Sequence, residues 1–127
     1  MTERLVDARA LQALVDALFR AAGTPGDEAA MVADALVLAD LRGMQSHGVL
    51  RVPTYIAKVR GGGFRPGHKG RVLRETAGTV LLDGEDGLGV VVSIRAMDEA
   101  MRKARACGIG AAGVTNGNHC GTGASAW

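Results

Sequence analysis

The residues with the clearest capacity for chemistry lie near the end of the sequence, in the stretch Asn-Gly-Asn-His-Cys-Gly-Thr-Gly over 116–123. Its imidazole, His119, can take up and release a proton near neutral pH. The glycines around it let the main chain adopt positive φ and let a ligand approach the backbone closely. The stretch therefore fits a loop on which His119 exchanges a proton with a bound molecule. A chemically inert Asn- and Gly-rich turn from strand to helix fits the same residues.

A second cluster, over positions 46–55, carries a hydroxyl, an imidazole, a guanidinium and a phenol. His47, Arg51 and Tyr55 follow one another at intervals of four, so on a helix they would share one face. Arg51 could grip a carboxylate with two parallel hydrogen bonds. His47, supported by Ser46, and Tyr55 could donate to a carbonyl or hydroxyl oxygen. We expect this cluster to face the His119 loop and to suit a small oxo acid; a helix cap followed by a solvated helix face is the alternative.

Two other patterns favour structure over chemistry. The run Gly84–Gly89 lacks the Gly-Lys-Ser/Thr ending of a phosphate loop and the Gly-x-Gly-x-x-Gly order of a dinucleotide loop, so a tight turn into a helix is favoured. No pair of histidines and cysteines has the spacing of a zinc site. His119 and Cys120 are adjacent, which rarely lets both side chains reach one ion. We therefore predict no metal site.

The composition is typical of one modest globular domain with a real core, since 47% of the 127 residues are hydrophobic and 22% are charged. Aromatic residues make up 3% and the net charge is +2, so we expect no nucleic-acid partner. The two cysteines form no disulfide framework, which favours a reducing cytoplasm. No apolar run reaches the length of a membrane span, and no signal peptide is expected.

Apolar spacing predicts three helices in the first half of the sequence. The first covers 7–22, and Gly23 is placed to end it in the left-handed conformation. Thr24 is expected to be the N-cap of a second helix that runs to about residue 42 and forms an antiparallel hairpin with the first. A third helix is predicted over about 50–60.

The second half alternates strands and a helix. Residues 71–75 and 79–83 read as a hairpin of two strands, followed by a helix over about 90–106 and a buried strand over 109–115. The buried stripe of the helix is predicted to contain Ile94, Met97, Met101 and Ala104, with Lys103 outside.

These elements predict an α/β (α+β) fold with a helical part over 1–66 and the start of a second domain over 67–127. The sequence ends at Ala124–Trp127 in the middle of an apolar pattern, whereas a native end is more often polar and frayed. We therefore expect it to be the front part of a longer protein.

Three segments together resemble a known family. They are A-D-L-R-G-M-Q-S-H-G-V-L-R-V-P-T-Y over 39–55, L-D-G-E-D-G-L-G over 82–89 and G-I-G-A-A-G-V-T-N-G-N-H-C-G over 108–121. In order and spacing they resemble the malate/L-lactate dehydrogenase family of NAD(P)-dependent oxidoreductases, which lacks the usual dinucleotide fold. The resemblance covers nearly the whole sequence. It implies an α/β fold with a mostly antiparallel sheet in the cofactor domain, and assembly as a homodimer or larger.

The resemblance also implies roles for individual residues. His119 would be the acid/base, assisted by Ser46 and His47, while Arg51 and Tyr55 would bind a small 2-hydroxy, 2-oxo or imino acid. The residues expected to help hold NAD or NADP are Asn118, Gly121, Thr122 and Gly123.

The sequence departs from the family pattern in two ways. Cys120 stands where the family usually has Phe, and 123–126 replaces a more aromatic continuation. The family chain is also far longer, and most of its cofactor-binding residues would lie beyond Trp127. Two hypotheses therefore stay open: part of an NAD(P)-dependent oxidoreductase, or a non-catalytic remnant or interaction module of the same family.

Overall fold

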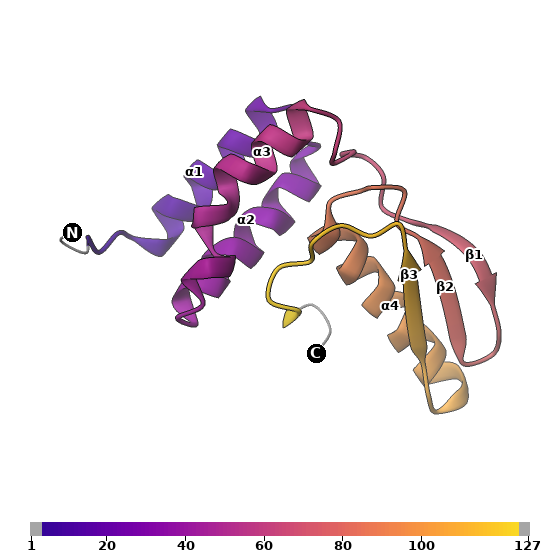
Figure 1. The fold of residues 1–127 in the computed structure, drawn as a ribbon. Coiled ribbons are helices and arrows are strands. Elements are labelled where there is room, and N and C mark those ends of the chain that lie inside the picture. The colour runs from indigo at the N-terminus through magenta and orange to yellow at the C-terminus, as the bar shows by residue number, and fades with distance from the viewer. Residues whose placement is uncertain (1–3, 125–127) are drawn as a thin grey trace.

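The helices and strands follow one another in an order that places a helical layer beside a small sheet (Figure 1). The computed structural model describes residues 4–124, so 125–127, where the apolar pattern reaches Trp127, lie outside it. None of the described helices is long and apolar enough to cross a membrane. The elements are α1 (Ala8–Ala21), α2 (Gly26–Leu41), the 3-10 helices η1 (Gln45–His47) and η2 (Val49–Arg51), α3 (Val52–Arg60), β1 (Arg71–Glu75), β2 (Thr79–Asp83), α4 (Gly89–Cys107) and β3 (Ala111–Thr115).

The predicted helical hairpin is present, and its turn differs from expectation in one detail. Gly23 has φ 95° and ends α1 as predicted. Thr24 is not the N-cap of α2, because that helix begins at Gly26 and Pro25 occupies the cap position. The Thr24 hydroxyl lies one residue too early to reach the first free N–H groups of α2. It is buried and finds no hydrogen-bond partner among the described residues.

The main hydrophobic core joins the helical layer to the start of α4. Phe19 and Leu36 from α1 and α2 pack in one cluster with Phe64, which follows α3, and with Leu88 and Val91 at the start of α4. All five are almost completely buried. Because this cluster contains residues from both sides of position 66, the helices and the first turns of α4 are held in a fixed relation.

The sheet is mixed and has the strand order β1-β2-β3. Strands β1 and β2 form the predicted antiparallel hairpin, and β3 pairs with β2 in parallel. Helix α4 covers one face, where Val80 and Leu82 pack against Ala96. The expectation of a buried last strand is wrong: Ile109 is 72% and Val114 is 40% exposed. In the described part of the chain β3 is an edge strand with a single neighbour, so its small residues remain open to solvent.

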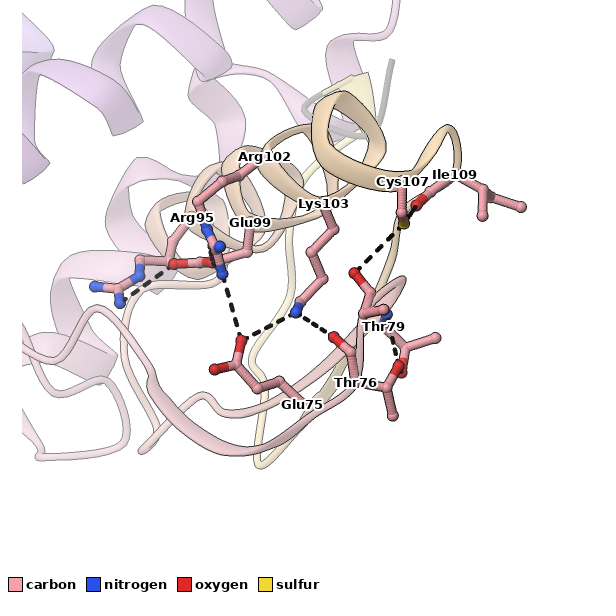
Figure 2. A network of polar contacts seen from close by, with 10 residues as sticks. Glu75, Thr76, Thr79, Arg95, Glu99, Arg102, Lys103, Cys107 and Ile109 are labelled. Atoms are coloured by element: carbon pink, nitrogen blue, oxygen red, sulfur yellow. Dashed lines mark hydrogen bonds and ion pairs between the residues drawn. The ribbon is translucent and has the colours of Figure 1, made fainter.

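The outer end of α4 is attached to the hairpin by a buried cation (Figure 2). Lys103, expected outside, is only 4% exposed, and Met101, expected inside, is 39% exposed. The Lys103 Nζ donates to Glu75 Oε2 at 3.0 Å and to the Thr76 carbonyl at 2.5 Å. The turn between β1 and β2 packs over this side of the helix, so the lysine stem is covered while its head is satisfied. Gly108, with φ 87°, then ends α4 as predicted.

Candidate active site

The structure brings together two imidazoles that lie far apart in the sequence. His47 ends η1, and His119 lies in the loop that follows β3. Their ring centroids are 5.5 Å apart and the ring planes are inclined by 28°, so the rings stack. The helical layer thus supplies one ring and the sheet layer the other, and the site forms where the two layers meet.

The turn that carries His47 is held by a carboxylate at the end of α2. Asp40 Oδ2 accepts the Val49 N–H at 2.9 Å, which caps the first turn of η2. A Cβ on Gly48 would lie 1.9 Å from Asp40 Oδ1, so only glycine lets the carboxylate lie against the turn. The Ser46 hydroxyl lies 2.8 Å from His47 Nδ1. Ser46 and Asp40 together fix the ring and its supporting backbone.

The loop that carries His119 is held against the start of α4. The Asn118 Nδ2 donates to the carbonyls of Asp86 and Gly87 at 2.9 and 3.0 Å. A Cβ on Gly89 would lie 2.2 Å from the His119 carbonyl oxygen, so the first residue of α4 must be glycine for the loop to pack there. Gly84–Gly89 thus makes a turn into α4 that also supports the His119 loop.

Tyr55 connects the two layers at the site. Its hydroxyl lies 2.6 Å from His119 Nδ1, and its ring packs edge-on against Phe64 at 5.2 Å between centroids. Burial raises the pKa of the Tyr55 phenol, while the nearby charge of Arg51 opposes that shift. The pKa of His119 is lowered, first by loss of water around the ring and then by the charges of Arg51 and His47. His119 is therefore biased toward its neutral form.

Arg51 supplies a cation beside the rings. Its Nε donates to the Ser46 carbonyl at 2.6 Å, which fixes the guanidinium against the turn. Over residues 4–124, no carboxylate lies within ion-pair distance of it. The remaining N–H groups of Arg51 can therefore receive an anion from outside the chain, and a carboxylate matches their geometry.

A cavity of about 210 Å³ adjoins the site between α2 and α4. Its walls are mostly apolar, and His47, Cys120, Gly121 and Thr122 are among the residues that line it. Gly121 and Gly123 have φ values of 74° and 73°, which favour glycine at both positions. Within the described residues, no group of three possible metal ligands comes together.

Sequence reasoning missed Asp40 as a support of the site and assigned Asn118 to the cofactor without seeing its structural role. A signal for Asp40 existed, because an acidic side chain in the last turn of a helix opposes the helix dipole and so needs another reason to be there. The contacts of Asn118 with Asp86 and Gly87 carry no local signal, since they depend on how the two loops meet.

Comparison with known proteins extends these observations. A family model described as malate/L-lactate dehydrogenase matches residues 6–126. The chain is 46% identical over 99 residues to a malate dehydrogenase of Pyrococcus abyssi, which covers 78% of this chain and 27% of that protein. It is 39% identical over 99 residues to an L-sulfolactate dehydrogenase of Methanocaldococcus jannaschii, covering 78% of this chain and 29% of the relative. The chain thus spans less than a third of these relatives.

Solved structures of longer proteins contain the same fold. A malate dehydrogenase from Pyrococcus horikoshii superimposes with a TM-score of 0.87 at 39% identity, over 94% of this chain and 36% of that one. A malate dehydrogenase from Entamoeba histolytica gives a TM-score of 0.90 at 35% identity, over 94% and 34% of the two chains. The arrangement of helices and sheet described above is therefore also found in these longer proteins.

Proposed function

We propose, from the premise that this chain belongs to the malate/L-lactate dehydrogenase family, that it forms the substrate-facing third of an NAD(P)-dependent oxidoreductase. The substrate would be a small 2-hydroxy or 2-oxo acid, or the corresponding imino acid. The observation that carries this proposal is the position of the His119 ring, which stacks on His47, is hydrogen-bonded to Tyr55 and lies near Arg51, a cation without a carboxylate partner among residues 4–124.

In this proposal each residue has one task. Arg51 binds the substrate carboxylate through the guanidinium N–H groups that Ser46 leaves free. His119 exchanges a proton with the substrate oxygen, a step that contributes about 10²–10⁴-fold to such reactions. His47, whose Nδ1 is hydrogen-bonded to the Ser46 hydroxyl, orients that oxygen. Tyr55 stays in contact with His119 and the edge of the substrate site.

The residues after His119 fit a nicotinamide ring, because the neighbouring cavity is mostly apolar and glycines leave its edge open. A bound nicotinamide would supply or accept the hydride. We propose that Gly121, Thr122 and Gly123 contact it through their backbone, and Asn118 through its amide oxygen, since the amide nitrogen is already engaged. The cofactor in this proposal is NAD or NADP, and we propose that the full-length protein is a cytoplasmic homodimer.

The test uses a chimeric chain in which residues 1–124 precede the part of the Pyrococcus abyssi malate dehydrogenase that follows its matched segment. Reduction of 2-oxo acids is followed by loss of NADH or NADPH absorbance. The proposal predicts activity that His119→Ala lowers by about 10²-fold or more with cofactor affinity unchanged. A folded His119→Ala chimera that reduces substrate at the parent rate would contradict the role of His119.

A non-catalytic remnant or interaction module of the same family is the alternative. Titration of the 127-residue chain with NADH or NADPH, followed by cofactor fluorescence, separates the two. Binding would support a working cofactor edge in this chain. No binding at millimolar cofactor would favour the remnant for this chain alone.

A further inference from the structure

We propose that Tyr55 is a positioning residue that holds neutral His119 with its proton on Nε2, and that it passes its own proton to Nδ1 when Nε2 gives its proton to the substrate. The proton transfer during catalysis rests on the proposed function. The position of the proton on resting His119 does not, because it is a property of this chain by itself.

The tautomer of His119 follows from a neighbouring group that can donate a hydrogen bond but cannot accept one. The backbone N–H of Gly121 points at His119 Nδ1 at 3.3 Å, and a backbone N–H has no lone pair to offer. Nδ1 must therefore be an acceptor when this contact is made. The Tyr55 hydroxyl, at 2.6 Å from the same nitrogen, can donate or accept, and it donates when Nδ1 carries no proton. The proton of the neutral ring then resides on Nε2.

The hydroxyl of Tyr55 is held in place by its surroundings. The side chain is only 4% exposed and belongs to the main core cluster, and Phe64 supports the ring edge-on. Helix α3 fixes the backbone of Tyr55; the helix begins at Val52, and Arg51 is its N-cap. A buried, packed phenol keeps its oxygen within hydrogen-bond reach of His119, in the way that a third group orients the base of a nucleophile–base pair.

The chemical consequence concerns reduction of a carbonyl group. The Nε2–H of His119 donates to the substrate oxygen, and that oxygen takes the proton when the hydride reaches the neighbouring carbon. At the same time Nδ1 takes the proton of the Tyr55 hydroxyl, so no imidazolate forms, and the charge of Arg51 stabilises the tyrosinate that is left. After the product leaves, Nε2 regains a proton from water, and Nδ1 returns its proton to the Tyr55 oxygen. One proton is consumed for each carbonyl reduced.

The experiment is nitrogen NMR of the 127-residue chain labelled with ¹⁵N-histidine, at a pH well above the ordinary histidine pKa. Long-range proton–nitrogen correlations show which ring nitrogen carries hydrogen. We expect His119 to show a protonated Nε2 and an unprotonated Nδ1. In Tyr55→Phe, which keeps the packed ring and removes only the hydroxyl, the longer Gly121 contact is the one of these two that is left on Nδ1, so we expect the Nδ1–H tautomer to appear beside the Nε2–H tautomer. Ser46→Ala is the matched control, because it removes the hydroxyl from Nδ1 of the other histidine and should leave the tautomer of His119 unchanged.

A wild-type His119 that carries its proton on Nδ1 would overturn the proposal without any variant being needed, as would a Tyr55→Phe chain with the same single tautomer as the wild type. In the chimeric enzyme, Tyr55→Phe should lower kcat by about 10²-fold with KM little changed. A correct tautomer in an inactive chimera would count against the proposed function, whereas an active chimera with unchanged kcat in Tyr55→Phe would count against the relay.

Discussion

Replacing Gly89 with alanine should move the His119 loop while leaving the chemistry of every side chain intact. Gly89 is the first residue of α4, and its missing Cβ lets the helix lie directly under the loop. The added carbon would be 2.2 Å from the His119 carbonyl oxygen and 2.5 Å from that of Asn118. Both are backbone atoms, so no side-chain rotation can relieve the contact.

The size of the effect follows from these distances. Ordinary van der Waals contact begins at 3.4 Å, so the His119 carbonyl must retreat from 2.2 Å by about 1.2 Å. Overpacking of this kind costs about 1–3 kcal/mol of folding free energy. In an open helix the same change would instead stabilise the fold by up to about 1 kcal/mol. A shift of about 1 Å in a catalytic group can lower the rate by about 10²-fold.

The assay combines urea unfolding of the 127-residue chain with kcat/KM of the chimeric enzyme. Gly113→Ala is the matched control, because its Cβ would make an ordinary contact of 3.4 Å with Leu81 Cδ1. We expect Gly89→Ala to lose stability and about 10²-fold in kcat/KM, and Gly113→Ala to lose little of either. A Gly89→Ala chain that is more stable than the wild type, with unmoved His119 resonances, would refute the packing described here.

Three further predictions concern the fold and its response to pH. Lys103→Met should lower the free energy of unfolding by about 1–3 kcal/mol, because the Thr76 carbonyl loses its donor and Glu75 loses the nearer of its two donors; urea unfolding with Arg105→Met as an exposed control checks this. Leu82→Ala, at a fully buried site between the sheet and α4, should cost about 2–5 kcal/mol by the same assay, and a loss under about 1 kcal/mol would mean that this core is not packed as described. Because the pKa of His119 is lowered in the folded chain, the unfolded chain takes up a proton on this ring more readily. The contribution of neutral His119 to the free energy of unfolding is therefore complete above the ordinary pKa of 6.5, and it is lost as the pH falls through 6.5 toward the folded pKa. Thermal unfolding from pH 8 to 5 should therefore show a slope that His119→Gln reduces, and an identical slope in the variant would contradict it.

The elements that could be predicted from the sequence are those with a strong local signal. Apolar spacing predicted the helices, and Gly23 and Gly108 ended two of them in the left-handed conformation as expected. The α/β class and the β1–β2 hairpin were confirmed for the same reason. The family itself was predicted from three motifs and is confirmed by the match over residues 6–126.

Features that depend on long-range packing escaped prediction. The parallel pairing of β3 with β2 leaves no trace in a five-residue strand of small side chains. Lys103 has the helical position of a surface residue, and only the approach of the hairpin turn buries it. The two clusters were expected to face each other, but the stacking of the His47 and His119 rings was not predicted, since neither motif contains information about the geometry of the other. Their roles in catalysis stay predictions.

The proposed active site requires His47 and His119 to lie side by side, and a single NMR experiment tests that. A nuclear Overhauser spectrum of the 127-residue chain should show cross-peaks between ring protons of His47 and His119, whose centroids are 5.5 Å apart. Cross-peaks between Tyr55 and Phe64, at 5.2 Å, serve as the internal reference for a folded core. A spectrum with the Tyr55–Phe64 peaks and none between the two histidines would contradict the active site described here.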